Sequence, residues 1–133
     1  MRITLVISLI SFVCLSTSCK KKGNTTEPEV PSVITITTPT AGTVYINGSA
    51  LRVTGNMTDD NVLSVAKVEI RNKVSGTVYN TQSSTTGNVG YFGFDWAWTV
   101  TGITTTTQAT VKVTAKDKLG NEVYTEVDVT LDN

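Results

Sequence analysis

Three aspartates are the side chains in this sequence best suited to binding a metal ion. Asp59 and Asp60 precede Asn61 in a stretch expected to be a loop, and Asp117 ends a strand-like segment. Calcium takes about six to eight oxygen ligands, mainly carboxylates and carbonyl groups. This set is short of ligands, and Asp and Asn also favour turns because their side chains bond the local backbone. We therefore expect turn chemistry, with a calcium site at Asp59, Asp60 and Asp117 as the alternative.

Two tryptophans could recognise a sugar. Trp96 and Trp98 are two residues apart, so on a strand they point to the same side at a spacing of about 7 Å. Exposed rings at that spacing could stack on a glycan. Phe92 and Phe94 continue the same row, however, and a small domain needs aromatic side chains in its core. The pattern favours a core position, and glycan contact through Trp96 and Trp98 is the alternative.

The composition argues against catalysis and against binding of nucleic acid. There is no histidine, which removes the commonest general base and the commonest metal ligand together. No Gly-rich phosphate loop and no Ser-x-x-Lys in a helical context is present. Lys and Arg total 11 and Asp and Glu total 11, so the net charge is zero and no basic face is expected. We expect a protein that is not an enzyme, requires no cofactor and does not bind nucleic acid.

The first 18 residues are expected to be a signal peptide. Met1-Arg2 is followed by an apolar run from Ile3 to Leu15 and by the small residues 16–18. This order of a positive start, an apolar stretch and small residues is typical of a secretory signal. The run is about 13 residues long, below the roughly 18 to 20 needed to cross a bilayer. The segment is therefore expected to direct export and then to be removed.

Cys19 directly follows these small residues and resembles the modified cysteine of bacterial lipoproteins. In that family the cysteine becomes the first mature residue and its thiol is acylated, which implies a lipid bilayer as a partner. One departure is Ser16, which stands where a Leu is usual, while Leu15 lies one place earlier. Cys14 is the competing candidate, but Phe12 and Val13 before it are bulky. The alternative is ordinary secretion with a free thiol.

A polar segment then leads to the main body of the chain. Residues 19–31 are expected to be the lipidated cysteine and a flexible tether, because they offer too little apolar surface to fold. The run Cys19-Lys20-Lys21-Lys22-Gly23 resembles lipoproteins of the Bacteroidetes, whose lipobox is loose. That resemblance implies a lipid-anchored protein of the outer membrane. The sequence does not decide whether the protein faces the periplasm or the cell surface. The periplasmic face is preferred because no acidic export signal follows the cysteine.

Residues 32–133 are predicted to be all-β. Thr, Val and Ile supply 51 of the 133 residues, and these β-branched side chains favour strands. Apolar and polar residues alternate in most segments, for example Ala66, Val68 and Ile70 against Lys67 and Glu69. Such alternation indicates strands with one wet face, hence antiparallel sheets. About seven strands in some 100 residues match an immunoglobulin-like β-sandwich.

The same residues resemble the bacterial Ig-like domains of envelope lipoproteins and adhesins. The resemblance rests on three stretches: residues 34–42, residues 58–61, and residues 111–121 with the sequence VKVTAKDKLGN. It covers residues 32–133 and implies an antiparallel sandwich that acts as a structural or protein-interaction module of the cell envelope. The alternative function is a glycan-binding module that uses surface aromatics. The partner, protein or glycan, is not specified by the sequence, because this fold serves many functions.

Overall fold

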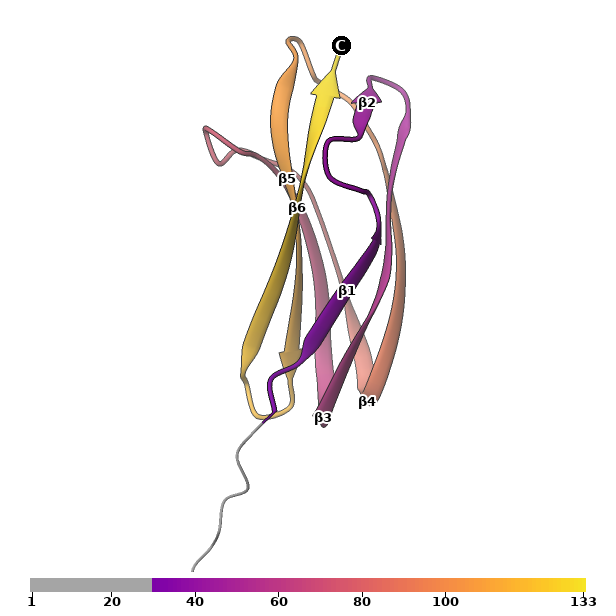
Figure 1. Cartoon of the computed structure of the whole chain (residues 1–133), viewed down its shortest axis with the longest axis vertical. Coiled ribbons are helices and arrows are strands. Elements are labelled where there is room, and N and C mark those ends of the chain that lie inside the picture. Colours follow the sequence, from indigo (N-terminus) through magenta and orange to yellow (C-terminus); the bar gives the residue numbers. More distant parts are fainter. Residues whose placement is uncertain (1–29) are drawn as a thin grey trace, which may run out of the picture.

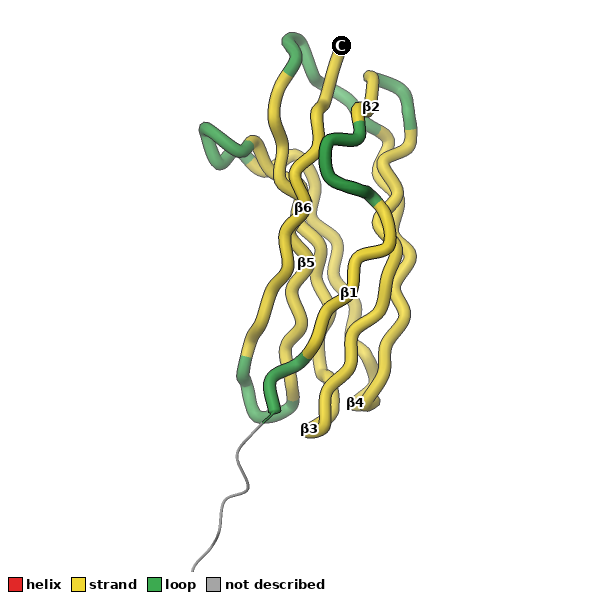
Figure 2. The backbone as a smooth tube through the Cα atoms, viewed as in Figure 1, coloured by secondary structure: helices red, strands yellow, loops and turns green. Residues whose placement is uncertain are grey.

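The computed structural model describes residues 30–133, so the predicted signal peptide and Cys19 lie outside the described residues. In this range the chain forms strands and no helix (Figures 1 and 2). The strands are β1 (Val33–Thr38), β2 (Val44–Ile46), β3 (Ala50–Asn72), β4 (Val78–Thr99), β5 (Thr107–Asp117) and β6 (Glu122–Asp132). Residues 30–133 accordingly contain no helix that could span a membrane.

Strands β3 and β4 form one long two-stranded ribbon that folds back on itself. Residues 50–58 of β3 pair with residues 99–91 of β4, and residues 63–71 of β3 pair with residues 89–78 of β4. The register shifts between Thr58 and Leu63, and both strands double back at the same end of the molecule (Figure 1). Each strand therefore has a first half and a second half that lie in different layers.

The two layers make a β-sandwich. One layer holds β1, the first half of β3 (residues 50–58) and the second half of β4 (residues 91–99). The other holds the first half of β4 (residues 78–89), the second half of β3 (residues 63–72), β5, β6 and β2. The chain moves from the first layer to the second between β1 and β2, next to Pro39, which follows a cis peptide bond.

The bend in β3 has a local chemical cause. The Asp59 carboxylate accepts a hydrogen bond from the Asn61 backbone N–H at 2.7 Å, which is the side-chain turn that Asp favours. Val62 next to it has φ of 63°, a left-handed conformation that is uncommon for a β-branched residue. On β4, Gly87 and Asn88 also have positive φ, at 75° and 59°. Turn-forming residues therefore bend both strands at the same end of the molecule.

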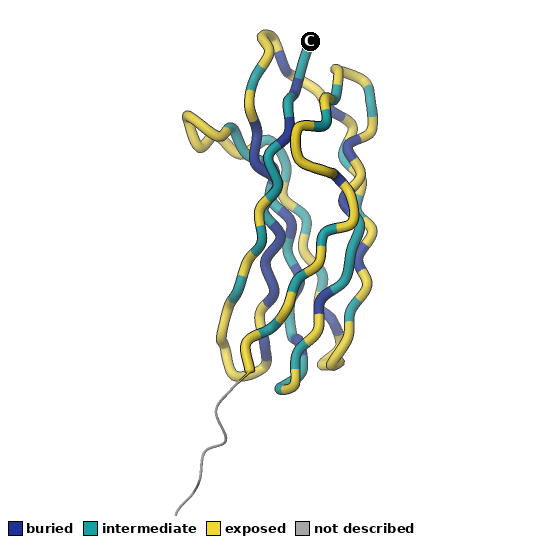
Figure 3. Tube along the Cα trace, in the orientation of Figure 1, coloured by how far each residue is buried: buried dark blue, intermediate teal, exposed yellow. Residues whose placement is uncertain are grey.

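The core lies between the layers and follows the predicted alternation. Buried apolar side chains come mostly from every second residue of β3, β5 and β6, and Figure 3 shows buried residues as dark blue segments that alternate with exposed ones along these strands. The fully buried large side chains include Leu51, Val53, Met57, Leu63, Val68, Ile70, Val111, Val113, Val129 and Leu131. Every buried side-chain nitrogen or oxygen in residues 30–133 has a hydrogen-bond partner.

The prediction of an immunoglobulin-like all-β sandwich is confirmed, with three corrections of detail. Six strands are present instead of about seven, because segments predicted as separate strands are halves of the continuous β3 and β4. The expected loop at residues 59–61 lies within β3 for the same reason. The sheets are not purely antiparallel, since Val44–Ile46 pairs with β6 in parallel. A strand of three residues is too short for its sequence to indicate whether it pairs in parallel or antiparallel.

Candidate functional site

Asp59 and Asp117 lie together at the end of the sandwich where β3 and β4 bend. Both line one cavity of about 270 Å³, with Pro31, Ser32, Asn121 and Val123. Asp60 is exposed and lines a neighbouring surface hollow with Val30 and Val33. The structure therefore brings the predicted calcium ligands to one end of the domain. Asp59 lines both hollows, whereas Asp117 lines only the first and Asp60 only the second.

The carboxylates of this end bind protein groups. Asp117 is 2% exposed and accepts hydrogen bonds from the backbone N–H and the side-chain amide of Asn121, at 2.7 and 2.8 Å. Asp59 accepts from Asn61 and from the Ser32 hydroxyl. Within residues 30–133, no three His, Cys, Asp or Glu side chains come close enough together to hold a metal ion. These bonds hold the β5–β6 turn and the β3 bend.

Trp96 and Trp98 lie on the second half of β4 and face inward. Both are partly buried and pack against the core. Trp96 stacks on Phe94 with ring centroids 4.9 Å apart, and Trp98 stacks on Tyr79 at 6.2 Å. One face of each tryptophan is therefore covered by another aromatic ring. The rings stay partly exposed because β4 is the outermost strand on this side of the sandwich.

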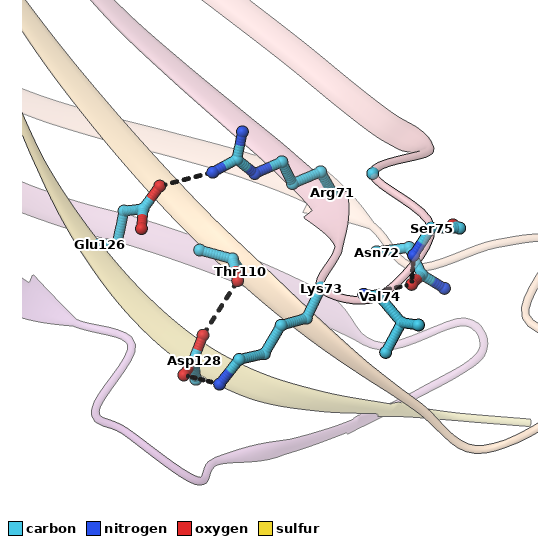
Figure 4. Close-up of a pocket in the computed structure, with 9 residues that line it drawn as sticks. Arg71, Asn72, Lys73, Val74, Ser75, Thr110, Glu126 and Asp128 are labelled. Carbon is cyan, nitrogen blue, oxygen red and sulfur yellow. Dashed lines mark hydrogen bonds and ion pairs between the residues drawn. The ribbon is translucent and has the colours of Figure 1, made fainter.

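A charged surface on the other layer was not identified from the sequence. Arg71 pairs with Glu126 at 2.6 Å, and Lys73 pairs with Asp128, beside a cavity of about 480 Å³ (Figure 4). Hydrogen bonds from Lys73 and then from Thr110 hold the pKa of Asp128 below its ordinary value. The alternation of apolar and polar residues predicts that these charged side chains face the solvent. It does not predict which acid pairs with which base, because that depends on strand register. In this arrangement each acid already has a base as its partner.

The edge of β4 is the remaining feature that could bind a partner. Among residues 30–133, β4 pairs only with β3, so it forms the outer edge of both layers. The strand is 22 residues long and its edge is divided by the bend into residues 78–89 and 91–99; it contains no Pro or Lys and carries one charged residue, Asp95. The Arg52 guanidinium hydrogen-bonds to Asp95 and lowers the pKa of that carboxyl. Gln82 on the first half donates to the Ala97 carbonyl on the second half at 2.9 Å, which ties the two edges together.

Comparison with known proteins supports the fold and leaves the family open. No protein-family model matches this sequence, and no curated protein matches it. Among solved structures, it is similar to fibronectin(III)-like modules of Clostridium thermocellum CbhA, with 18% identity and a TM-score of 0.50 over 75% of this chain and 96% of that one. CopC from Methylosinus trichosporium OB3b aligns with 13% identity and a TM-score of 0.48, over 77% of this chain and 94% of that one. The chain therefore has an immunoglobulin-type β-sandwich fold with a fibronectin(III)-like neighbour.

Proposed function

We propose that this protein is a non-catalytic lipoprotein of the bacterial cell envelope. Acylated Cys19 anchors it in the outer membrane, and the β-sandwich binds a partner protein. The periplasmic face is the proposed location. The sequence supports the anchor through the signal-like residues 1–18 and the cysteine that follows them. Two or three acyl chains give effectively permanent attachment, at about 0.8 kcal/mol for each buried methylene.

The position of the chain entry is the observation that carries this proposal. Val30 and Pro31 adjoin the end of the sandwich that contains the β3 bend and the β5–β6 turn, while the C-terminus lies at the opposite end (Figure 1). Cys19 is 11 residues before Val30 in the sequence, a span of at most about 40 Å when extended. A lipid at Cys19 would hold the domain by this end and leave the sides and the far end of the sandwich accessible.

Membrane fractionation of two cysteine variants tests the anchor. We expect the native protein and the Cys14→Ser variant to stay in the membrane fraction in high salt and at alkaline pH, because the acyl chains sit on Cys19. The Cys19→Ser variant should appear in the soluble fraction. The Cys14→Ser protein is the matched control, since it removes the other thiol by the same change. A soluble native protein, or membrane retention of the Cys19→Ser variant, would overturn the proposal.

Glycan binding through Trp96 and Trp98 is the second candidate. Its support is the partial exposure of both rings at the β4 edge. Stacking of Trp96 on Phe94 and of Trp98 on Tyr79 leaves less ring surface for a sugar than a free aromatic platform would offer. A glycan array gives the comparison directly. Hits that disappear in the Trp98→Ala variant would favour this candidate over the protein-binding proposal.

A further inference from the structure

We propose that the second half of β4, residues 91–99, binds an extended peptide segment of another protein by strand addition. The inference rests on the proposed function and specifies the binding surface and the chemistry of its partner. A strand edge offers backbone N–H and C=O groups in a row, and an extended polypeptide is the ligand that satisfies them. The β4 edge has backbone groups with which such a partner could form hydrogen bonds, and partly exposed side chains that it could cover.

The hydrogen-bond pattern identifies the backbone groups that point outward. The Val100 N–H donates to the Ser49 carbonyl at 2.9 Å, and these two residues flank the paired Ala50 and Thr99. In an antiparallel ladder this bond marks Ala50 and Thr99 as a pair that does not bond to each other directly. Thr99 therefore turns its N–H and C=O away from β3.

The register then extends this result along the strand. Residues 50–58 pair with 99–91 with no register shift, so every second residue repeats the orientation of Thr99. The outward groups belong to Tyr91, Gly93, Asp95 and Ala97. The bond from Gln82 to the Ala97 carbonyl agrees with this orientation, because it reaches that oxygen from the first half of β4. The segment from Tyr91 to Asp95 is consequently the central part of the proposed edge site.

The inward side chains of this segment define the preference for a partner. Phe92, Trp96 and Trp98 pack on the core and remain partly exposed, whereas Phe94 is buried. In the described residues no strand lies beyond β4 to cover their outer rims. An added strand would place every second side chain against these rings. The partner is thus an extended segment with apolar side chains at alternate positions and polar side chains between them.

The other edges of the sandwich differ from this one. β1 has six residues and is followed closely by Pro39, and β2 has three residues. Short strands and Pro are two of the usual protections against pairing with another chain. The 22-residue β4 has neither of these protections and has no Lys. Residues 122–127 of β6 also pair with β5 alone, but they carry Glu122 and Glu126, whereas the second half of β4 carries only Asp95. The open edge of β4 is therefore the one that best accepts a continuous added strand.

A second copy of this chain fits the edge less well than a foreign segment. Antiparallel pairing of two β4 edges relates the copies by a two-fold axis perpendicular to the strands. That symmetry places the Val30 end of one copy beside the C-terminal end of the other (Figure 1). Two domains anchored through Cys19 in one membrane would then point in opposite directions. The proposed anchor therefore favours a segment of a different protein.

Hydrogen exchange with a defined peptide tests the site. The protein is the mature chain, residues 19–133, with Cys19→Ser so that it stays in solution. The probe is the blocked peptide KTVTVTVTK, which alternates Val with Thr. We expect saturating peptide to slow exchange of the Tyr91, Gly93 and Asp95 amides by about tenfold or more, because they gain hydrogen-bond acceptors. The β1 amides should keep their rates.

Two controls make the test specific. The same peptide with every second amide N-methylated should lose binding, because it lacks the donors that pair with β4. The Gly93→Pro variant should bind the probe about tenfold more weakly by losing one outward donor, and Gly93→Ala should bind normally. If Gly93→Pro fails to fold by circular dichroism, the methylated peptide still decides the question.

Three outcomes would overturn the site. They are protection at an edge other than β4, equal binding of the methylated peptide, and dimerisation of the protein through β4 in sedimentation experiments. None of them alters the fractionation result for Cys19, so failure of the edge site and failure of the lipid anchor are distinguishable.

Discussion

Gly55 lies directly against the ring of Phe94 on the neighbouring strand. A Cβ atom at Gly55 would come 2.6 Å from Cζ of Phe94 and would also collide with the Thr35 carbonyl oxygen of β1. Glycine in the middle of a strand normally weakens it. Here it creates the space that lets Phe94 reach the core, where the ring is 4% exposed and stacks on Trp96.

Substitution of this glycine should be costly. We expect Gly55→Ala to destabilise the domain by about 3 kcal/mol, since backbone and a packed ring must both move. The melting temperature would fall by more than about 10 °C. Gly93→Ala is the matched control in the paired strand, because a Cβ there meets its nearest atoms at 3.8 Å or more. Equal melting temperatures for the two variants would show that the close contact at Gly55 is not real.

The buried carboxylate of Asp117 should matter for the β5–β6 turn. Asp117→Ala removes the acceptor of two hydrogen bonds from Asn121 and leaves those donors to find other partners. We expect a loss of about 2 kcal/mol in urea unfolding. Asp60→Ala at the exposed neighbouring position should change stability by less than about 0.5 kcal/mol. A larger loss for Asp60→Ala than for Asp117→Ala would contradict the assignment of the structural role to Asp117.

Calcium should have no effect on stability. The Asp59 and Asp117 carboxylates are held by Ser32, Asn61 and Asn121, so a cation would have to replace existing bonds. A ligand that binds only the folded state raises the melting temperature once its concentration exceeds its Kd. We therefore expect equal melting temperatures in excess Ca²⁺ and in chelator. A calcium-dependent rise that disappears in the Asp59→Asn variant would instead establish a metal site.

Acid should weaken the domain partly through Asp128. Bonds from Lys73 and Thr110 lower the pKa of Asp128 in the folded state, below the value of about 3.9 for an unfolded chain. The resulting stabilisation is present above that unfolded value and is lost as pH falls through the folded pKa. In an NMR titration, Lys73→Met should therefore raise the pKa of Asp128. Lys118→Met, which removes an equal charge at the β5–β6 turn, should leave that pKa unchanged.

Residue types predict the strands of this protein much better than they predict its surfaces. The alternation around Val53, Val68 and Val113 predicts which side chains face the core, because successive side chains of a strand point to opposite faces and every second residue is apolar. The place of Asp59 beside Asp117 in one cavity depends on how the strands are ordered in the sandwich. The exposure of Trp96 and the pairing of Lys73 with Asp128 depend on strand order and register. Those are long-range properties that no local pattern contains.

Mass spectrometry of the native protein, purified from its membranes, tests the account most directly. The central claim is that export removes residues 1–18 and leaves an acylated Cys19 at the start of a chain that carries the β-sandwich. We predict an N-terminal peptide beginning at Cys19 whose mass includes a diacylglyceryl group, with or without a further acyl chain. An intact leader, or a Cys19 thiol without lipid, would contradict the claim.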